Sequence, residues 1–291
     1  MSRIIDGKAS ALLVRRGVAE GVQRFRERYG RAPALHFVLV SEDAGSVGYV
    51  RSKEKAAAEA GMTAQVHRFP PGVSPSALHG LIVELNRDEG VDGILVQLPL
   101  PGHISAEALL ESVNPAKDVD GLHPMNVGRL WSGNATLAPC TPRGCQHLLR
   151  EAGVVLEGAR ALVVGRSNLV GKPTAALLLA ANASVTLAHS YSQNLPGLCR
   201  EADVLVVAVG QARLVQGDWI KPGAAVIDVG ANRGADGKPC GDVDFEGATR
   251  NAALITPVPG GVGPMTIAML LDNTLRAAQA RLAQGSVEVS P

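Results

Sequence analysis

Short apolar runs alternate with amphipathic stretches along almost the whole chain. The apolar runs are rich in Ala, Val, Leu and Ile, which is typical of strands covered on both faces. They predict strands at residues 34–40, 63–69, 93–98, 161–164, 184–188, 204–207, 225–229 and 253–256. Helical spacing of apolar positions predicts helices at residues 46–60, 74–87, 142–152, 170–181 and 264–282. Such alternation indicates parallel sheets with right-handed crossovers, and therefore an α/β fold.

One stretch, residues 114–141, interrupts this alternation because it is rich in glycine and proline. A strand, a glycine turn and a helix begin afresh at Arg160. We therefore predict two α/β domains: a catalytic domain at residues 1–138 joined by a C-terminal helix at 264–291, and a Rossmann-type nucleotide-binding domain at 139–263. A terminal helix that returns to the first domain would put the glycine turn at a cleft between the two, where ligands tend to bind.

Composition and charge narrow the range of partners. The chain is 46% hydrophobic and 19% charged, as in ordinary globular proteins, and its net charge of +1 comes without a basic block. We therefore expect no nucleic-acid partner. No apolar run approaches the length of a membrane span, and residues 1–10 lack the apolar core of an export signal. The four cysteines show no CxxC spacing, which predicts a cytoplasmic protein with reduced thiols and no metal site. They are Cys140, Cys145, Cys199 and Cys240.

The stretch from Ala161 to Pro173 is an apolar strand, a glycine turn and a helix start. Pro173 suits the first helical turn, and the free N–H groups at that helix end favour a phosphate in the turn. The spacing Gly165-x5-Gly171 is neither GxGxxG nor a P-loop. Taken alone, a turn that merely packs remains an alternative.

The surroundings of this turn indicate which dinucleotide binds. The strand at 184–188 ends before His189 and Ser190, where a Rossmann-type unit meets the adenosine ribose. No Asp or Glu occurs from Thr186 to Leu195, whereas Arg166 and Ser190 could hold a 2′-phosphate. We therefore infer NADP as the cofactor. Gly210 and the segment Gly230–Ala231 follow further strands, where glycine lets a ligand approach the backbone; ordinary strand–turn chemistry is the alternative.

The first half of the chain carries candidate proton chemistry. Tyr49 and Lys53 lie four residues apart on one predicted helical face. A lysine there is useful as a base if burial lowers its pKa toward neutrality, although most such pairs are surface residues. Gln97 ends the strand at 93–98, where it reaches a cleft or is simply a satisfied strand-end amide. The loop from Lys117 to Gly121 offers two carboxylates; with no third ligand cluster, we prefer recognition of N–H donors on a heterocycle over a metal.

Six motifs in this order resemble the bifunctional methylenetetrahydrofolate dehydrogenase/methenyltetrahydrofolate cyclohydrolase family. The resemblance spans nearly the whole chain, and its last motif is highly specific. The motifs are Tyr49-Val-x-x-Lys53, Asp92-Gly-x-x-Val-Gln97-Leu-Pro-Leu-Pro101, Lys117-Asp-Val-Asp-Gly121, Pro139-Cys-Thr-Pro142, Val163-Val-Gly-Arg-Ser167 with Val170-Gly171, and Ile255-Thr-Pro-Val-Pro-Gly-Gly-Val-Gly-Pro-Met-Thr266.

The resemblance implies a role for each matching position. Lys53 handles protons as water attacks the methenyl carbon, and Gln97 sits beside it and helps set its protonation. Tyr49 lines the folate site and Asp120 binds the pterin ring. The remaining matches form a loop that closes on folate and a set of cofactor contacts. The loop is Pro259, Gly260, Gly261 and Val262, and the cofactor contacts are Gly165, Arg166, Ser167, Ser190 and the backbone near Ala231.

Two positions depart from the family pattern: Ala231 stands where Ile is usual, and Tyr191-Ser192 where many relatives carry a basic residue. The second departure leaves Arg166 as the chief support for NADP. The family further implies a homodimer and a place in one-carbon metabolism and purine biosynthesis. The alternatives are a folate enzyme with dehydrogenase activity only, a two-domain dehydrogenase of the amino-acid or shikimate type, and a non-catalytic folate or nucleotide sensor.

Overall fold

The computed structural model of this chain describes residues 2–285, which divide into two compact units. Unit 1 holds the chain up to Leu12 and Pro139–Met269, and unit 2 holds Leu13–Ala138 and the chain from Leu270 onward. This division differs from the expected domains in two places. Residues 2–12 and the start of the last helix belong with the larger sheet rather than with the predicted catalytic domain. The last residues of that predicted domain, 286–291, lie outside the described residues.

Unit 1 is built on a six-stranded sheet in the order β1-β11-β8-β7-β5-β6, with every neighbouring pair parallel. Since β5 lies between β6 and β7, the strand order reverses at β5, and ligands of such sheets bind at the carboxyl ends beside this switch point. The pairing of β1 with β11 also explains why the first residues belong to this unit. The strands are β1 (Arg3–Ile4), β5 (Arg160–Val164), β6 (Ser184–Ala188), β7 (Val204–Val207), β8 (Ala225–Asp228) and β11 (Leu254–Ile255).

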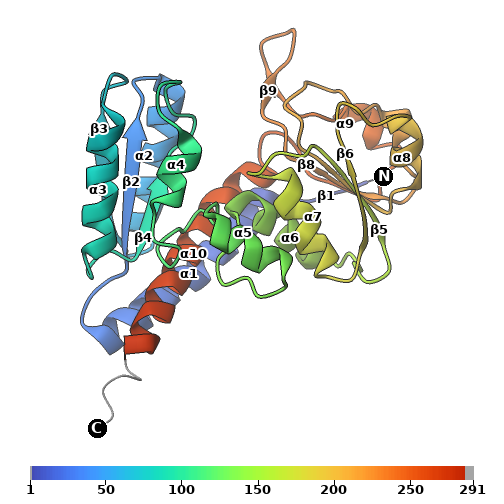
Figure 1. The fold of residues 1–291 in the computed structure, drawn as a ribbon. Helices are drawn as coiled ribbons and strands as arrows, with labels where there is room; N and C mark the ends of the chain where they lie inside the picture. The colour runs from blue at the N-terminus through green and yellow to red at the C-terminus, as the bar shows by residue number, and fades with distance from the viewer. Residues whose placement is uncertain (1, 286–291) are drawn as a thin grey trace. The chain divides into compact units, whose positions relative to one another are not determined.

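Helices cover both faces of this sheet (Figure 1). On one face, α7 (Gly171–Leu179) packs on β5 and β6 and against α6 (Cys140–Glu151). On the other face, α8 (Leu195–Glu201), the 3-10 turn η1 (Gly217–Trp219) and α9 (Phe245–Ala248) close an apolar core that includes Leu162, Val207 and Val226. A short antiparallel hairpin, β9 (Asn232–Arg233) and β10 (Pro239–Cys240), follows β8.

Unit 2 contains a three-stranded parallel sheet in the order β3-β2-β4. Its strands are β2 (Ala34–Val40), β3 (Thr63–Phe69) and β4 (Gly93–Val96). Its helices include α2 (Ala44–Glu59), α3 (Pro75–Arg87), α4 (Ala106–Glu111) and α5 (Pro124–Trp131). The N-caps Asp43 and Ser74 fix the starts of α2 and α3 by accepting backbone N–H groups. A core that includes Val38, Ile82 and Ile94 joins the sheet to α3.

Two long helices contribute residues to both units: α1 (Gly7–Tyr29) and α10 (Val262–Gly285). Within unit 2 they approach closely, because a Cβ added to Gly21 of α1 would lie 2.5 Å from a methyl of Leu275 in α10. A larger side chain at position 21 would therefore require the Leu275 side chain to move.

The predicted α/β class and parallel sheets are confirmed. Strand 93–98 is shorter than predicted and ends at Val96, before the cis peptide bond between Leu98 and Pro99. The long helix α1 and the elements β1, α4, α8, α9, β9 and β10 are additions to the prediction. The glycine- and proline-rich stretch 114–141, in which no helix was predicted, contains α5 and the start of α6.

Two further findings concern the environment of the chain. Among residues 2–285, no helix is both long enough and apolar enough to cross a membrane. All four cysteines are buried and none forms a disulfide.

Candidate active site

A buried lysine lies against an amide in unit 2. Lys53, on α2, is only 5% exposed, and its Nζ donates a hydrogen bond to Oε1 of Gln97 at 3.0 Å. The same Nζ lies 4.4 Å from the ring centroid of Tyr49, one helical turn earlier. Tyr49 itself is 37% exposed. The predicted trio is thus brought together, with a proton-carrying amine between an uncharged acceptor and an aromatic face.

Gln97 is positioned by the sheet and by the peptide that follows it. Its backbone N–H donates to the carbonyl of Val38 on β2, at the carboxyl end of the strand pair. Its Nε2 donates to the carbonyl of Leu98 at 2.6 Å. Because Nε2 is engaged there, the amide presents its oxygen to Lys53 rather than its NH2 group.

The two carboxylates of the loop after β4 have different environments. Asp118 is buried; its Oδ2 accepts from the backbone of His123 and from Nδ2 of Asn126, both at 2.8 Å. Burial raises the pKa of Asp118, and these hydrogen bonds oppose that rise. Asp120 is half-buried. Asp118 therefore holds the loop, which leaves Asp120 as the candidate for binding a ligand.

Two charged residues of the predicted motifs serve the fold. Nζ of buried Lys117 donates to the carbonyls of Leu85, Asn86 and Asp88, and burial lowers its pKa to about 8. Asp92, which is fully buried, accepts from Arg31 at 2.6 and 2.8 Å and from Arg281 at 3.0 Å. These bonds take up the polar atoms of both side chains, so Lys117 and Asp92 hold segments of the chain together. Within residues 2–285, no group of three or more His, Cys, Asp or Glu side chains is placed to hold a metal ion.

In unit 1, the glycine turn lies at the switch point of the sheet. Gly165 follows β5 with φ of +119°, and a Cβ there would lie 2.1 Å from the carbonyl oxygen of Ala208 after β7. A Cβ on Gly171, the first residue of α7, would lie 1.9 Å from the carbonyl oxygen of Gly165. Only glycine fits at either position, so the backbone forms a tight concave turn at the site where dinucleotides bind in such sheets.

Ser167 shapes this turn. Its Oγ accepts from the backbone N–H groups of Val170 at 3.1 Å and Gly171 at 3.3 Å. A hydroxyl that accepts two bonds keeps its own hydrogen for donation. The exposed Ser167 can therefore offer that hydrogen to a phosphate at the start of α7.

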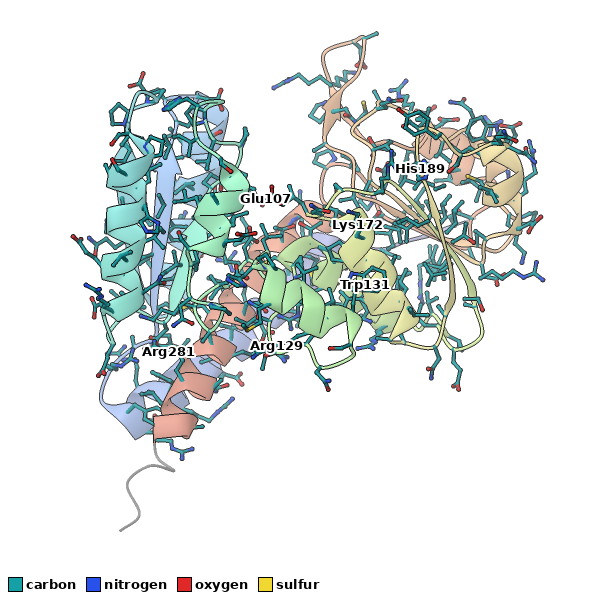
Figure 2. The ribbon with its side chains drawn as sticks, in the orientation of Figure 1. Glu107, Arg129, Trp131, Lys172, His189 and Arg281 are labelled. Atoms are coloured by element: carbon teal, nitrogen blue, oxygen red, sulfur yellow. The ribbon has the colours of Figure 1, made fainter. Side chains whose placement is uncertain are left out.

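The cation of the turn lies over an aromatic ring. The guanidinium carbon of Arg166 is 5.5 Å from the ring centroid of Tyr191, which is 80% exposed. Tyr191 lies two residues after His189, which directly follows the last residue of β6 and is labelled in Figure 2. Ser190, between them, is exposed. Arg166 and Ser190 thus follow neighbouring strands, as the prediction of a 2′-phosphate site requires.

The strand-end residues Gly210 and Ala231 are both exposed, and Gly210 has φ of +68°. Sequence reasoning missed what supports them. The buried carboxylate of Asp242 accepts from the backbone of Val209 and Gly210, and a second buried carboxylate, Asp228, lies beside it. Burial raises the pKa of Asp228 to about 6 against the opposing effect of three backbone N–H donors. The only sequence signal was the pair of aspartates flanking a short polar hairpin.

The predicted folate loop lies in unit 1 and leads into α10, whose first residue is Val262. It contains a cis peptide bond between Val258 and Pro259, and Gly260 has φ of +107°. A Cβ on Gly261 would lie 2.6 Å from the carbonyl oxygen of Pro257, so this turn also requires glycine. The contact of Pro259–Val262 with folate stays a prediction.

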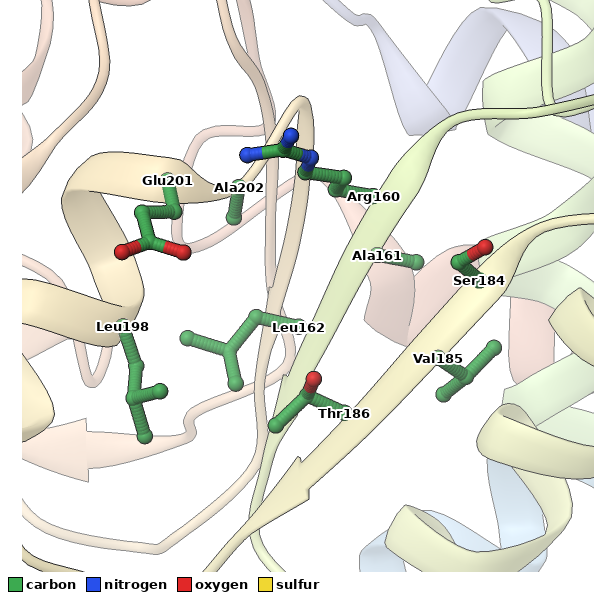
Figure 3. Close-up of a pocket in the computed structure, with 9 residues that line it drawn as sticks. All are labelled: Arg160, Ala161, Leu162, Ser184, Val185, Thr186, Leu198, Glu201 and Ala202. Carbon is green, nitrogen blue, oxygen red and sulfur yellow. The ribbon is translucent and has the colours of Figure 1, made fainter.

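A hollow of about 160 Å³ elsewhere in unit 1 is not this site (Figure 3). It is lined by the first three residues of β5, the first three of β6 and the end of α8. It therefore lies at the amino ends of parallel strands, opposite to the glycine turn. None of the predicted site residues lines it.

A doubly wound sheet with a glycine turn at its switch point is typical of a unit that binds NAD(P). In this chain the sheet belongs to the same polypeptide as a second α/β unit that contains a buried lysine. The fold and the site therefore define a class of protein: a two-domain, dinucleotide-dependent enzyme. Two family models match the chain. The catalytic domain of tetrahydrofolate dehydrogenase/cyclohydrolase matches residues 5–120, and the NAD(P)-binding domain of the same family matches residues 139–282.

Individual proteins agree with these matches. The chain is 58% identical over 284 residues to the bifunctional protein FolD of Sorangium cellulosum, covering 97% of this chain and 99% of the relative. The structure of the bifunctional enzyme FolD, a methylenetetrahydrofolate dehydrogenase/cyclohydrolase from Campylobacter jejuni, is similar with a TM-score of 0.94 and 44% identity, covering 97% and 100% of the two chains. A Trypanosoma brucei N5,N10-methylenetetrahydrofolate dehydrogenase-cyclohydrolase, solved with NADP cofactor and inhibitor, has a TM-score of 0.92 and 41% identity, covering 97% and 98%. This chain belongs to the tetrahydrofolate dehydrogenase/cyclohydrolase family.

Proposed function

We propose that this protein oxidises 5,10-methylene-tetrahydrofolate to 5,10-methenyl-tetrahydrofolate with NADP, and then hydrolyses the product to 10-formyl-tetrahydrofolate. The observation that carries the second activity is the 3.0 Å hydrogen bond between buried Lys53 and Gln97. A binding protein needs no buried amine of this kind, whereas hydrolysis needs a group that accepts and returns protons.

The cofactor fits unit 1. Gly165 and Gly171 form the turn for the diphosphate, with the Ser167 hydroxyl beside it, and Arg166 and Ser190 are the groups for a 2′-phosphate. Gly210 and Ala231 offer exposed backbone at the neighbouring strand ends. When bound, NADP supplies the acceptor for the hydride. The chain's task in that reaction is to hold donor and acceptor in line.

The hydrolytic step requires movement of protons on this chain's own groups. Water adds to the methenyl carbon, the bond from that carbon to N5 breaks, and the formyl group stays on N10. Of the two water protons, one ends on N5 and the other is released. The neutral Lys53 amine is the base that takes a proton from the attacking water, and Gln97 keeps that amine in place through its oxygen. Tyr49 and Asp120 bind the folate, with Asp120 accepting N–H donors of the pterin ring.

The test separates the two activities. Lys53→Met is expected to lower hydrolysis of methenyl-tetrahydrofolate by about 100-fold or more, while hydride transfer partly persists and methenyl-tetrahydrofolate accumulates. Absorbance assays with methylene- and methenyl-tetrahydrofolate, the former run separately with NADP and NAD, measure both rates. Lys55→Met is the matched control, because Lys55 lies on the same helix with its side chain 78% exposed; both rates should stay at the wild-type level.

Each alternative gives a different outcome in these assays. Equal loss of both activities in Lys53→Met, with folate binding intact, contradicts the assigned role of Lys53. Oxidation without any hydrolysis by the wild-type protein favours a dehydrogenase-only folate enzyme. Tight binding of both ligands without turnover favours a sensor.

The remaining parts of the proposal concern context. We propose a cytoplasmic homodimer that serves one-carbon metabolism and supplies purine biosynthesis with 10-formyl-tetrahydrofolate. The four buried cysteines without disulfides support a reducing compartment. The net charge of +1 supports small-molecule rather than nucleic-acid ligands.

A further inference from the structure

A buried carboxylate in unit 1 joins two loops that follow neighbouring strands. Asp242 is fully buried. Its Oδ2 accepts from the backbone N–H of Val209 at 2.7 Å and of Gly210 at 3.0 Å, in the loop after β7. Its Oδ1 accepts from Nδ2 of Asn232 at 2.8 Å, at the start of β9 in the connection that follows β8. One side chain therefore sets the spacing of two loops at the carboxyl edge of the sheet.

The backbone of Asp242 is itself fixed. Its N–H donates to Oδ1 of Asp228 at 2.9 Å, and its carbonyl accepts from the N–H of Val215 at 3.0 Å. Asp228 also accepts from Gly230 and Val243, both at 2.9 Å. The carboxylate of Asp242 thus extends from an anchored segment, which is how a positioning group keeps its geometry.

Two glycines allow the backbone to pack closely against the two aspartates. A Cβ on Gly230 would lie 2.4 Å from the backbone nitrogen of Asp242, and a Cβ on Gly241 would lie 1.8 Å from Oδ2 of Asp228. Both carboxylates therefore serve as fixed acceptors beneath the loops. Two exposed residues of those loops, Gly210 and Ala231, are among the proposed cofactor contacts.

We propose that Asp242 is a positioning residue of the dehydrogenase reaction, which holds the backbone at Gly210 and at Ala231–Asn232 in the arrangement that binds NADP. This inference rests on the proposed function. Asp242 touches neither ligand nor reacting atoms. It acts because an acceptor-only side chain can satisfy three converging donors, which no neutral side chain of its size does.

The contact between Asp242 and Asn232 can be tested by exchanging the two side chains. Asn232→Asp places a second carboxylate against Oδ1 of Asp242 and should force the loops apart. The combination Asp242→Asn with Asn232→Asp restores one donor and one acceptor at that contact and keeps an oxygen for Val209 and Gly210. Asp242→Ala removes all three bonds at once, and Asp242→Asn alone should be milder, because Asn232 can turn its amide.

NADPH affinity, measured by fluorescence titration, is the main readout. We expect the dissociation constant to rise about 10- to 100-fold in Asp242→Ala and in Asn232→Asp, and the double variant to recover most of the loss. Asp236→Ala, at the exposed tip of the same hairpin, should bind NADPH like the wild type. In steady-state assays the KM for NADP should rise more than the KM for folate, and hydrolysis of methenyl-tetrahydrofolate should fall less than NADPH affinity.

Three outcomes are decisive. Wild-type affinity in Asp242→Ala overturns the inference, as does a double variant no better than Asn232→Asp alone. If circular dichroism shows that Asp242→Ala does not fold, the comparison of Asn232→Asp with the double variant still tests the inference. Failure of the wild-type protein to bind NADPH would instead contradict the proposed function.

Discussion

Three hydrogen bonds fix Gln97, and they determine that its amide oxygen faces the amine of Lys53. Its backbone N–H donates to Val38, its Nε2 donates to Leu98, and its Oε1 accepts from Lys53. An amide oxygen accepts from a neutral or a charged amine alike, whereas a carboxylate would favour the charged form. An uncharged partner therefore suits an amine that must gain and lose a proton in each turnover.

Cofactor choice should depend on Arg166. Arg166→Ala is expected to raise the dissociation constant for NADP by about tenfold or more, and to change that for NAD far less, because only NADP carries a 2′-phosphate. Titration with both nucleotides measures the difference. Arg250→Ala, an exposed cation elsewhere in unit 1, is the control for loss of net charge. An equal loss of both affinities would remove the basis for inferring NADP from this turn.

Some of these site residues could be predicted from the sequence, and others could not. Lys53, Gln97 and Arg166 each belong to a short motif, and other residues of the same motif are assigned to the same site. Asp242 does not, because its partners Gly210 and Asn232 lie 32 and 10 residues away and contribute backbone and amide N–H groups. A side chain that acts through distant backbone leaves no local pattern. Tyr191 could be read only as a missing basic residue, whereas the structure gives it a contact with Arg166.

At the scale of elements, the pairing of β2 with β3 places two histidines in contact. Nδ1 of His36 lies 3.0 Å from Nε2 of His67, so one ring donates to the other. Burial, and then the charge of His67, lowers the pKa of His36, and burial lowers the pKa of His67. Both rings are thus neutral when folded at pH values where the unfolded chain already takes up protons.

This pairing predicts acid sensitivity of unit 2. Below about pH 6.5 the unfolded chain binds more protons at these histidines than the folded unit does, so the free energy of unfolding should fall as the pH drops from 7 to 5. His67→Gln should flatten this dependence, because it removes one titrating ring and keeps a hydrogen-bonding group. Urea unfolding at a series of pH values measures it. His79→Gln, at an exposed position on α3, is the control and should leave the pH dependence of the free energy of unfolding unchanged. If His67→Gln showed the wild-type pH dependence, the histidine pair would not be its cause.

Element prediction succeeded where apolar periodicity is strong and failed where packing decides. Strands β2, β3, β6 and β7 were predicted with the observed bounds. The long helix α1 was missed because Gly17 and Gly21 reduce its helical signal, and the reason for Gly21 is its packing against Leu275, a residue more than 250 positions away. The two-residue strand β1 has no periodicity to detect; it exists because β11 offers it an edge.

At the scale of the whole molecule, neither unit is one continuous segment of the chain. Unit 1 is completed by the first residues, and unit 2 by the chain from Leu270 onward. The sequence predicted that the last helix returns to the first domain, but it could not give the exchange at the amino terminus, which depends on pairing between residues more than two hundred positions apart. Long-range pairing of this kind carries no local signature.

One amide of the last helix should control the position of the Asp120 loop in unit 2. Asn273 is fully buried, and its Nδ2 donates to the carbonyls of Val119 at 2.8 Å and Ala138 at 2.9 Å. Val119 precedes Asp120, so a residue of α10 holds the backbone beside the proposed pterin ligand. Asn273→Ala leaves both buried carbonyls without this donor. It should therefore lower the free energy of unfolding by about 2–4 kcal/mol, and the KM for folate should rise more than kcat falls.

Gln279→Ala, at an exposed position of the same helix, is the matched control and should change the free energy of unfolding by less than about 0.5 kcal/mol. Denaturant unfolding and steady-state kinetics on both variants measure the two effects separately. A destabilised Asn273→Ala protein with wild-type KM for folate would mean that Asn273 supports the fold alone. A raised KM means that the Asp120 loop depends on a helix that begins 142 residues after it, because Asn273 of that helix donates to the carbonyl of Val119, next to Asp120.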